Sequence, residues 1–341
     1  MTAQLHRHFP ELGESLRRVT LGRAPTPVRP LEALSEEAGA EVWLKDDGTF
    51  GGPWGGNKVR KLEWTLADAI RRRHRSVLTI GALGTNHGLA TALHARELGL
   101  RCVLALVDQP EDEHVREQLD RIRASGATVV VTRTRARTVL ALPWLLARHA
   151  SLRTGRLPYL LPVGGSSPLG CLGYVEAALE LGEQVARGEL PEPAHAVVPV
   201  GSAGTAAGLV LGLRLAGLRT RVVGVVVSDR TKTNPEDIVA LAGRSAALLR
   251  DRGATLRGPA PDASRLDVHR DWMGPGYGHA TEESAAALAT AREREGLELE
   301  PVYTAKAMAG LIALGRAHAF EAGPVLYWHT HRSHPSGPPG A

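Results

Sequence analysis

Short apolar segments alternate with longer segments of helical periodicity along most of this chain. Apolar residues dominate 77–80 and 101–107, and residues 85–99 between them carry Leu89 and Leu93 at helical spacing. Short apolar runs are typical of buried strands, whereas apolar positions three or four residues apart are typical of helices. This part of the chain therefore predicts one strand–helix–strand unit.

The same alternation continues to the end of the chain. Further helices are predicted over 111–126, 138–150 with an interruption at Pro143, 167–188 and 201–217, and further strands over 128–132, 195–200, 221–227 and 325–330. Strands that alternate with helices favour mainly parallel sheets covered by helices. We therefore expect an α/β fold, and 341 residues are enough for two domains.

Composition and charge narrow the classes of protein to consider. Hydrophobic residues make up 43% of the chain and charged residues 23%, which is typical of a globular protein. The net charge of +5 and the pI near 9.5 are compatible with nucleic-acid binding. The basic residues are scattered, however, and only five tyrosines and three phenylalanines could stack on bases. We therefore expect no nucleic-acid partner.

Cysteines, histidines and the N-terminal segment add three negative expectations. Cys102 and Cys171 form no C-x-x-C pair, which argues against a disulfide framework and a cysteine zinc site. The histidines of 329–334 have no acidic residue or cysteine near them in sequence, so we expect no metal. The N-terminus lacks the apolar segment of a signal peptide, and no apolar run is long enough to cross a membrane. These features predict a cytoplasmic protein with no membrane partner.

A glycine-rich turn, GSAGT at 201–205, joins a predicted strand to a predicted helix. Free backbone N–H groups and the helix dipole at such a turn favour a phosphate group. The glycine spacing fits neither a dinucleotide fingerprint nor a Walker loop. Asp229 follows the next strand, as a ribose-binding acid would, so a dinucleotide site stays open as an alternative. A tight turn that serves packing alone is the second alternative.

Two more polar turns open predicted helices. In 81–88 the residues Thr85, Asn86 and His87 follow a strand, and Ser166 lies in a third glycine-rich turn. Polar groups at a helix N-terminus can bind an anion, although Thr85 or Asn86 could equally be an N-cap. Two turns of this kind suit a ligand with a phosphate at one end and a carboxylate at the other.

Lys58 directly follows the glycine-rich stretch 55–57 and stands at the start of an amphipathic segment. A lysine is ordinarily a solvated surface residue. If the bound phosphate belongs to pyridoxal phosphate (PLP), one partly desolvated lysine must form a Schiff base with the cofactor aldehyde. The glycines before Lys58 would let the cofactor approach the backbone, which makes Lys58 the candidate.

The chain resembles the D-cysteine desulfhydrase and 1-aminocyclopropane-1-carboxylate (ACC) deaminase family of fold type II PLP enzymes. The similarity covers nearly the whole chain, in the segments 24–34, 55–63, 85–87, 162–180, 201–209, 274–278 and 301–312. It implies a two-domain, tryptophan synthase β-like fold and a homodimer. The larger PLP-binding domain would comprise 1–60 and 165–341, and the smaller inserted domain 61–164.

The resemblance also implies roles for residues toward the cofactor. Lys58 would form the Schiff base and then move the substrate α-proton, while Asn86 would bind the 3-oxygen of PLP. Thr330 would face the pyridine nitrogen. The phosphate would be held by Gly201, Ser202, Ala203, Gly204 and Thr205, helped by Lys61.

Toward the substrate, the resemblance implies that Tyr277 acts as an acid, a base or a hydrogen-bond donor. Thr85 would take part in catalysis. Thr85 and Tyr277 would also bind the substrate, together with Asn86, His87 and Ser166. The substrate would be a small amino acid, such as D-cysteine or a cyclopropane amino acid, converted to a keto acid and ammonia.

Two positions depart from the family pattern. Thr85 stands where the family usually has serine, and its extra methyl group stiffens the side chain. The family's T-G-G after the last strand is replaced by Thr330, His331 and Arg332, which would reshape the pocket beside the pyridine ring. Another reaction of the same cofactor, such as β-replacement, racemisation or a biosynthetic step, therefore stays open. So does a non-catalytic protein that binds a phosphate-bearing ligand.

Overall fold

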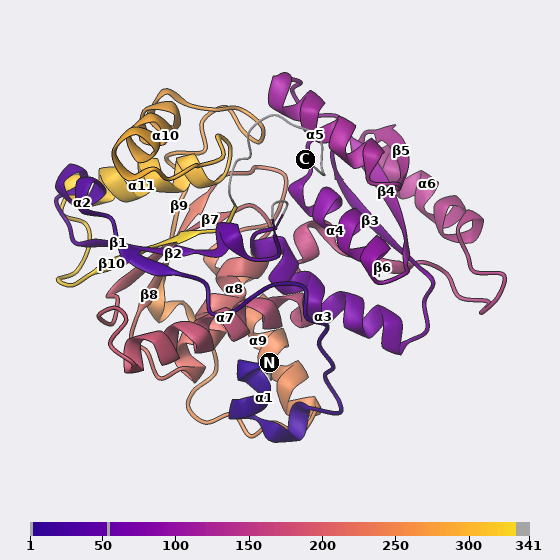
Figure 1. The fold of residues 1–341 in the computed structure, drawn as a ribbon, viewed down its shortest axis with the longest axis horizontal. Helices are drawn as coiled ribbons and strands as arrows, with labels where there is room; N and C mark the ends of the chain where they lie inside the picture. Colours follow the sequence, from indigo (N-terminus) through magenta and orange to yellow (C-terminus); the bar gives the residue numbers. More distant parts are fainter. Residues whose placement is uncertain (1–2, 53–54, 332–341) are drawn as a thin grey trace.

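Two β-sheets form the framework of the protein, shown as a computed structural model in Figure 1. The structure describes residues 3–52 and 55–331. The larger sheet has the strand order β1 (Val28–Pro30), β2 (Val42–Asp46), β10 (Val325–His329), β7 (His195–Val200), β8 (Arg221–Val226) and β9 (Leu266–His269). The smaller sheet has the order β5 (Thr128–Arg133), β4 (Arg101–Val107), β3 (Ser76–Ala82) and β6 (Tyr159–Leu161). The paired strands run parallel, except that β1 is antiparallel to β2.

Helices cover both faces of both sheets (Figure 1). They are α1 (Gln4–His8), α2 (Glu32–Ala38), α3 (Asn57–Arg71), α4 (Asn86–Glu97), α5 (Glu113–Ala124), α6 (Arg135–Arg148), α7 (Pro168–Ala186), α8 (Gly204–Leu215), α9 (Pro235–Asp251), α10 (Glu282–Glu295) and α11 (Thr304–Arg316). On the larger sheet, α1, α7, α8 and α9 pack on one face, and α2, α10 and α11 on the other. On the smaller sheet, α3, α4 and α5 face α6 across the strands. The predicted α/β class with mainly parallel, helix-covered sheets is confirmed.

The core of the larger sheet explains why its strand β10 is mainly apolar. In β10, Leu326 and Trp328 pack against one helical layer, whereas Val325 and Tyr327 pack against the other. Successive side chains of a strand point to opposite faces, so a strand covered on both sides buries every residue.

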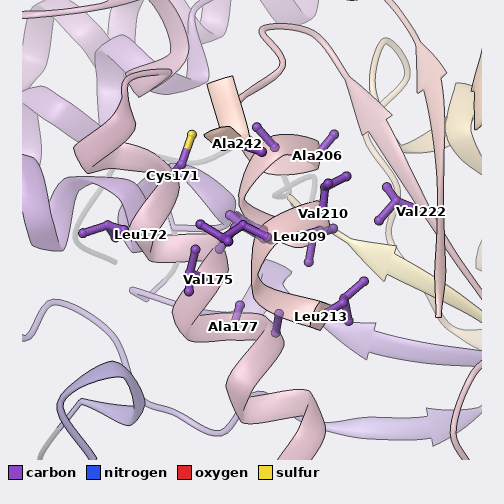
Figure 2. Close-up of a cluster of buried hydrophobic side chains, with 14 of the residues drawn as sticks. Cys171, Leu172, Val175, Ala177, Ala206, Leu209, Val210, Leu213, Val222 and Ala242 are labelled. Carbon is purple, nitrogen blue, oxygen red and sulfur yellow. The ribbon is translucent and has the colours of Figure 1, made fainter. Parts of the chain in front are cut away.

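Helices α7 and α8 pack unusually closely, as the cluster around Leu172, Val175 and Leu209 in Figure 2 shows. A Cβ atom on Gly208 of α8 would lie 2.5 Å from the Cys171 carbonyl oxygen of α7. Such a contact is too short for any real side chain, so a glycine is required where the two backbones meet. This packing fixes the start of α8, which carries the GSAGT turn.

Several sequence predictions are confirmed by these elements, and one is wrong. The strand predicted at 101–107 is β4, and the strand predicted at 195–200 is β7. Helix α6 is not interrupted at Pro143; it continues to Arg148. The Thr134 side chain caps the helix start by accepting from the Arg137 amide, and Leu145 is buried beyond the proline. These contacts keep the segments before and after Pro143 in one helix.

The domain boundaries at residues 61 and 164 stay a prediction. Strands β3 to β6, between residues 76 and 161, form one sheet.

Strands β1, β2 and β9 were not among the predicted strands. Among residues 3–52 and 55–331 no helix is long and apolar enough to cross a membrane. Arg332 and the predicted tail at 333–341 lie outside the described residues.

Candidate active site

A cavity of about 300 Å³ lies where strands of both sheets end. Ala82 closes β3, Gly201 follows β7 and Thr330 follows β10, and all three line the cavity. Carboxyl ends of parallel strands are the usual position of ligand sites in α/β proteins. The predicted site residues that line this cavity are Lys58, Thr85, Asn86, His87, Gly201, Ser202, Tyr277 and Thr330.

The first turn of α3 brings Lys58 into the cavity. Gly56 adopts φ 103°, and a Cβ atom there would lie 2.6 Å from the Thr330 carbonyl oxygen. The Asn57 amide donates to that same oxygen at 2.7 Å. The Lys58 Nζ atom in turn donates to the Asn57 Oδ1 atom at 3.0 Å. Glycine is therefore needed at position 56 so that the start of α3 can dock on the end of β10.

The electrostatic surroundings of Lys58 favour a neutral amine. Desolvation by the surrounding protein lowers the pKa of Lys58 well below 10.5, and the nearby positive charge of Lys61 lowers it further. The carboxylate of Glu300 acts in the opposite direction but more weakly. A neutral lysine amine is a nucleophile and a base at moderate pH.

Lys61 lies one turn further along α3. Its Nζ atom donates to the Gly164 carbonyl oxygen at 3.2 Å. Burial lowers the pKa of Lys61 to about 8. Lys61 is not among the residues that line the cavity.

The GSAGT turn leads into α8, and a small hollow lies beside its backbone. Ala203, directly before the helix, adopts a positive φ of 60°. A Cβ atom on Gly201 would lie 2.6 Å from the Tyr303 ring. Ala203 and Thr205 line a small hollow that adjoins the cavity and shares Lys58 with it. A helix N-terminus with a glycine cradle is suited to a phosphate.

Ser166 lies at this turn. Its hydroxyl donates to the Ser202 Oγ atom at 2.9 Å and accepts from the Gly204 amide at 3.1 Å. On the opposite side, the Asn57 side-chain amide donates to the Thr205 hydroxyl at 3.2 Å. The turn is thus linked both to the 163–167 segment and to the residue beside Lys58.

Thr85 is the N-cap of α4. Its Oγ1 atom accepts from the Gly88 amide at 3.1 Å, which leaves its hydroxyl proton free to donate. The methyl group that distinguishes threonine from serine lies against Gly88, where a Cβ atom would be 2.3 Å from Thr85 Cγ2. Glycine at 88 thus accommodates the extra methyl group. The next residue, Asn86, accepts from the Gln118 side chain at 2.8 Å.

His87 is buried with both of its ring nitrogens unpartnered among the described residues. Burial lowers the pKa of His87 to about 3, and the positive charges of Lys58 and Lys61 act in the same direction. The ring is therefore neutral at physiological pH, with one N–H donor and one acceptor. A buried imidazole without partners is costly unless a ligand supplies them.

Two tyrosines, Tyr277 and Tyr303, line the cavity as a pair. The hydroxyls of Tyr277 and Tyr303 are hydrogen-bonded, and the two rings meet edge to face at 5.9 Å. Desolvation raises the pKa of both hydroxyls, so both remain protonated at neutral pH. The Lys58 Nζ atom lies 5.8 Å from the Tyr303 ring centre. The pair can therefore donate a hydrogen bond near the lysine amine.

Arg135 and Arg230 also line the cavity. The Arg230 guanidinium lies 5.1 Å from the Tyr277 ring centre and donates to the Asp108 carbonyl oxygen at 3.0 Å. Arg135, at the start of α6, donates to the Arg230 carbonyl oxygen. Sequence reasoning missed these two residues, together with Asn57 and Tyr303. Asn57 and Tyr303 lie inside motifs noted above, but no local pattern pointed to the arginines.

His329, the last residue of β10, and His331, two residues further on, lie in different surroundings. His331 lines the cavity and shares a 3.1 Å hydrogen bond between its Nδ1 atom and the Gly55 carbonyl oxygen. His329 instead pairs with Asp46 at 2.9 Å and is fully buried. Within the described part of the chain, no three His, Cys, Asp or Glu side chains are grouped as metal ligands.

A buried ion network lies beneath α3 and holds it in position. Arg60, two residues after Lys58, pairs with Asp47 at 2.8 Å and with Glu180 at 3.1 Å. Lys45 of β2 pairs with Glu180 at 2.6 Å. Burial alone would raise the pKa of Glu180, but the charges of Arg60 and Lys45 lower it to about 2. The network joins β2, α3 and α7 at the base of the site.

These residues fit PLP. An amine of lowered pKa faces the cavity, and a glycine cradle that a Cβ atom would fill lies beside it. His87 offers two ring nitrogens that no described residue hydrogen-bonds. A phosphate-bearing aldehyde needs the first two features, and an amino acid carboxylate would be a partner for the third.

The chain belongs to the pyridoxal-phosphate dependent enzyme family, whose model matches residues 19–331. PLP is therefore its cofactor, and it is a fold type II PLP enzyme. Within that class, the chain belongs to the family of the D-cysteine desulfhydrases and ACC deaminases.

Named relatives support this placement. The chain is 38% identical to D-cysteine desulfhydrase of Klebsiella pneumoniae (strain 342), over 92% of this chain and 93% of the relative. It is 35% identical to D-cysteine desulfhydrase of Salmonella newport (strain SL254), with the same coverage. A solved ACC deaminase homologue matches with a TM-score of 0.80 and 32% identity, over 95% of this chain and 94% of that one. Serine racemase from Dictyostelium discoideum shares the fold, with a TM-score of 0.65 and 14% identity over 98% of each chain.

Proposed function

We propose that this protein is a PLP-dependent lyase that acts on a small amino acid. With an amino acid that carries an α-proton, the reaction would remove that proton, release the group on the β-carbon and, with water, leave a keto acid and ammonia. A cyclopropane amino acid has no α-proton, so its ring would open with loss of a ring C–H proton, and water would again release a keto acid and ammonia. The observation that carries the proposal is the Lys58 amine of lowered pKa, which faces a cavity between a glycine cradle and a tyrosine pair. The relatives named D-cysteine desulfhydrase favour D-cysteine as the first substrate to test. The cyclopropane amino acid is the second, because of the ACC deaminase homologue.

Each end of the substrate would have its own partners. The α-carboxylate would bind at the start of α4, where the Thr85 hydroxyl, Asn86 and the His87 ring line the cavity. The helix dipole at that end favours a negative charge. Binding there would place the α-carbon near Lys58, which would take up the α-proton as a neutral base. Its lowered pKa supports that role.

PLP, when bound, supplies a sink for the electron pair that the departing α-proton leaves behind. Thr330 would face its pyridine nitrogen, and Asn86 its 3-oxygen. Its phosphate would bind the turn formed by Gly201, Ser202, Ala203, Gly204 and Thr205, assisted by Lys61, with Ser166 supporting the turn. Tyr277 would donate a proton or a hydrogen bond at the group that leaves the β-carbon, since its hydroxyl stays protonated at neutral pH.

One experiment tests the cofactor attachment and the reaction separately. Borohydride reduction of the purified protein, followed by peptide mapping, should place the pyridoxyl group on Lys58 and nowhere in Lys58→Ala. Keto acid, ammonia and sulfide are then measured with D-cysteine, L-cysteine and the cyclopropane amino acid. Keto acid and ammonia from any of these, lost in Lys58→Ala, would support the proposal. Unchanged turnover in Lys58→Ala would refute it.

Another PLP reaction is the second candidate, and a specific observation favours it. His331 lines the cavity where the family usually has glycine, which narrows the space beside the pyridine ring. A substrate screen that releases neither keto acid nor ammonia, in a protein with labelled Lys58, would favour β-replacement or racemisation. Exchange of the α-proton with solvent, followed by NMR, would then identify the amino acids that bind productively.

We also propose a two-domain organisation and a homodimer. The larger domain would comprise 1–60 and 165–341, and the smaller 61–164. The separate sheet formed by β3 to β6 supports this division. Limited proteolysis near these boundaries and light scattering of the eluted protein test the two statements independently.

A further inference from the structure

A second hollow, of about 270 Å³, lies at the C-terminal ends of α8 and α9. Segment 256–265 closes it on the remaining side. No residue of its lining is shared with the cavity that contains Lys58. The position of α8 and α9 can be followed in Figure 1.

The lining of this hollow is strongly basic and partly apolar. No acidic side chain of the described chain lines it. Leucines supply the apolar part, from positions 211, 215, 218 and 256. Its arginines are Arg214, Arg219, Arg250, Arg257 and Arg265.

Some of these arginines hold the hollow together. Arg214 donates to the Ala260 carbonyl oxygen at 3.0 Å and pairs with Asp262 at 3.2 Å. Arg265 donates to the Leu218 carbonyl oxygen at 3.0 Å. These contacts tie segment 256–265 to the end of α8, so the shape of the hollow is built by the protein.

Arg250 and Arg257 differ from these arginines because neither side chain has an ion-pair or hydrogen-bond partner among the described residues. A basic residue near a helix C-terminus is favoured by the dipole, and this accounts for Arg250 in the last turn of α9. It does not account for Arg257, which lies outside any helix, nor for several guanidiniums around one hollow. Arg214 pairs with Asp262, and Arg219 lies 3.9 Å from Glu192. The remaining three arginines have no carboxylate partner among the described residues, and a bound anion would reduce the repulsion between them.

We propose that this hollow binds a small phosphorylated molecule with an apolar or ring-shaped part. Arg250 and Arg257 would bind the phosphate groups, because a guanidinium presents paired N–H donors that match phosphate oxygens. The leucine side chains would contact the apolar part. The inference does not depend on the proposed function, because the two sites share no residue.

Isothermal titration calorimetry on the PLP-loaded protein tests the proposal, since the cofactor then occupies the other phosphate site. The probes are inorganic pyrophosphate and ADP. We expect both to bind, and the double variant Arg250→Gln with Arg257→Gln to weaken both by about tenfold or more, as expected for lost charge-assisted hydrogen bonds. Higher salt should weaken binding as well.

The matched control is the double variant Arg153→Gln with Arg156→Gln, which removes the same charge from two exposed arginines outside both sites. We expect it to change neither affinity by more than about twofold. If the double variant folds poorly, the single variant Arg257→Gln, which lies outside any helix, is measured in its place and should also weaken binding of both probes. Absence of binding by either probe, or equal weakening in both double variants, would overturn the proposal. Tighter binding of a short random-sequence DNA duplex than of ADP, lost with Arg250 and Arg257, would also overturn it, in favour of a nucleic-acid surface.

Discussion

Replacing Glu180 by glutamine should destabilise the protein strongly, although Glu180 lies beneath the site and not in it. Glu180 is 1% exposed, and its carboxylate pairs with Lys45 at 2.6 Å and Arg60 at 3.1 Å. It also accepts from the Thr26 amide at 2.8 Å. Glu180→Gln removes the negative charge and leaves two buried cations with Asp47 as their remaining carboxylate in this network. The variant should therefore lose the free energy of unfolding that the ionised Glu180 carboxylate contributes through these two cations.

The size of the effect follows from the pKa. A fall in the pKa of Glu180 from 4.5 to about 2 corresponds to roughly 3 kcal/mol of stability at neutral pH. Loss of one partner of a buried ion pair costs about 3–5 kcal/mol, in agreement with this value. An unfolding entropy of about 2 cal/mol/K per residue then implies a fall of roughly 4–7 °C in Tm for 341 residues.

The effect should depend on pH with a definite sign. The folded-state pKa of Glu180 is depressed, so its stabilisation is complete above pH 4.5 and is lost as the pH falls toward 2. Differential scanning calorimetry of the PLP-loaded protein should therefore show the Tm values of wild type and Glu180→Gln converging over that range. Loss of α3 positioning should also weaken labelling of Lys58 by the cofactor.

Glu183→Gln on the same helix is the matched control. Its side chain is 29% exposed and pairs with Arg7, which is 52% exposed, so its loss should cost about 1 kcal/mol or less. A Tm of Glu180→Gln within about 1 °C of wild type at pH 7 would contradict the reasoning, given the expected shift. So would a Tm difference that stays constant down to pH 2.

Three further predictions concern the site itself. Gly201→Ala should weaken PLP binding at least about tenfold in a fluorescence titration, because its Cβ atom would lie 2.6 Å from the Tyr303 ring. Gly243→Ala should bind PLP as wild type does, because its Cβ atom would meet no described atom within 4 Å beyond the backbone of its own helix. Equal losses in both variants would contradict the cradle. The His87 ring should stay neutral down to about pH 4 in ¹⁵N NMR of the cofactor-free protein, because its pKa is about 3; titration near pH 6 would contradict this. PLP affinity should fall as the pH rises from about 7 to 9, where Lys61 with its pKa of about 8 loses its charge, and this slope should vanish in Lys61→Gln.

Local sequence patterns were enough to predict the class of fold and the first residues of the candidate site. Parallel strands such as β7 are mainly apolar because both faces are covered, so they are recognisable without any tertiary information. A glycine-rich turn before a helix is also a local signal, and GSAGT lies at the start of α8 as expected. Lys58 stood out because two glycines precede it, and the structure places it in the cavity with Thr85, Asn86 and His87.

Other parts of the fold had no local signal. Strand β2 carries Lys45 and Asp46, and a charged segment of this kind is ordinarily solvent-exposed. It is buried because Glu180, far along the chain, neutralises Lys45 at 2.6 Å. The helix through Pro143 was missed for a related reason, since contacts on both sides of the proline outweigh the hydrogen bond that it removes.

The sequence by itself determined that this chain forms parallel, helix-covered sheets, and it indicated a lysine and a glycine-rich turn at the start of two helices, because each of these is encoded within a few neighbouring residues. The tertiary structure alone decided what surrounds them. It placed Arg135 and Arg230 in the cavity lining, left both His87 ring nitrogens without a partner among the described residues, and gathered the arginines of the second hollow. The charge state of a side chain depends on burial and on charges from distant segments, and neither is encoded in its immediate neighbours.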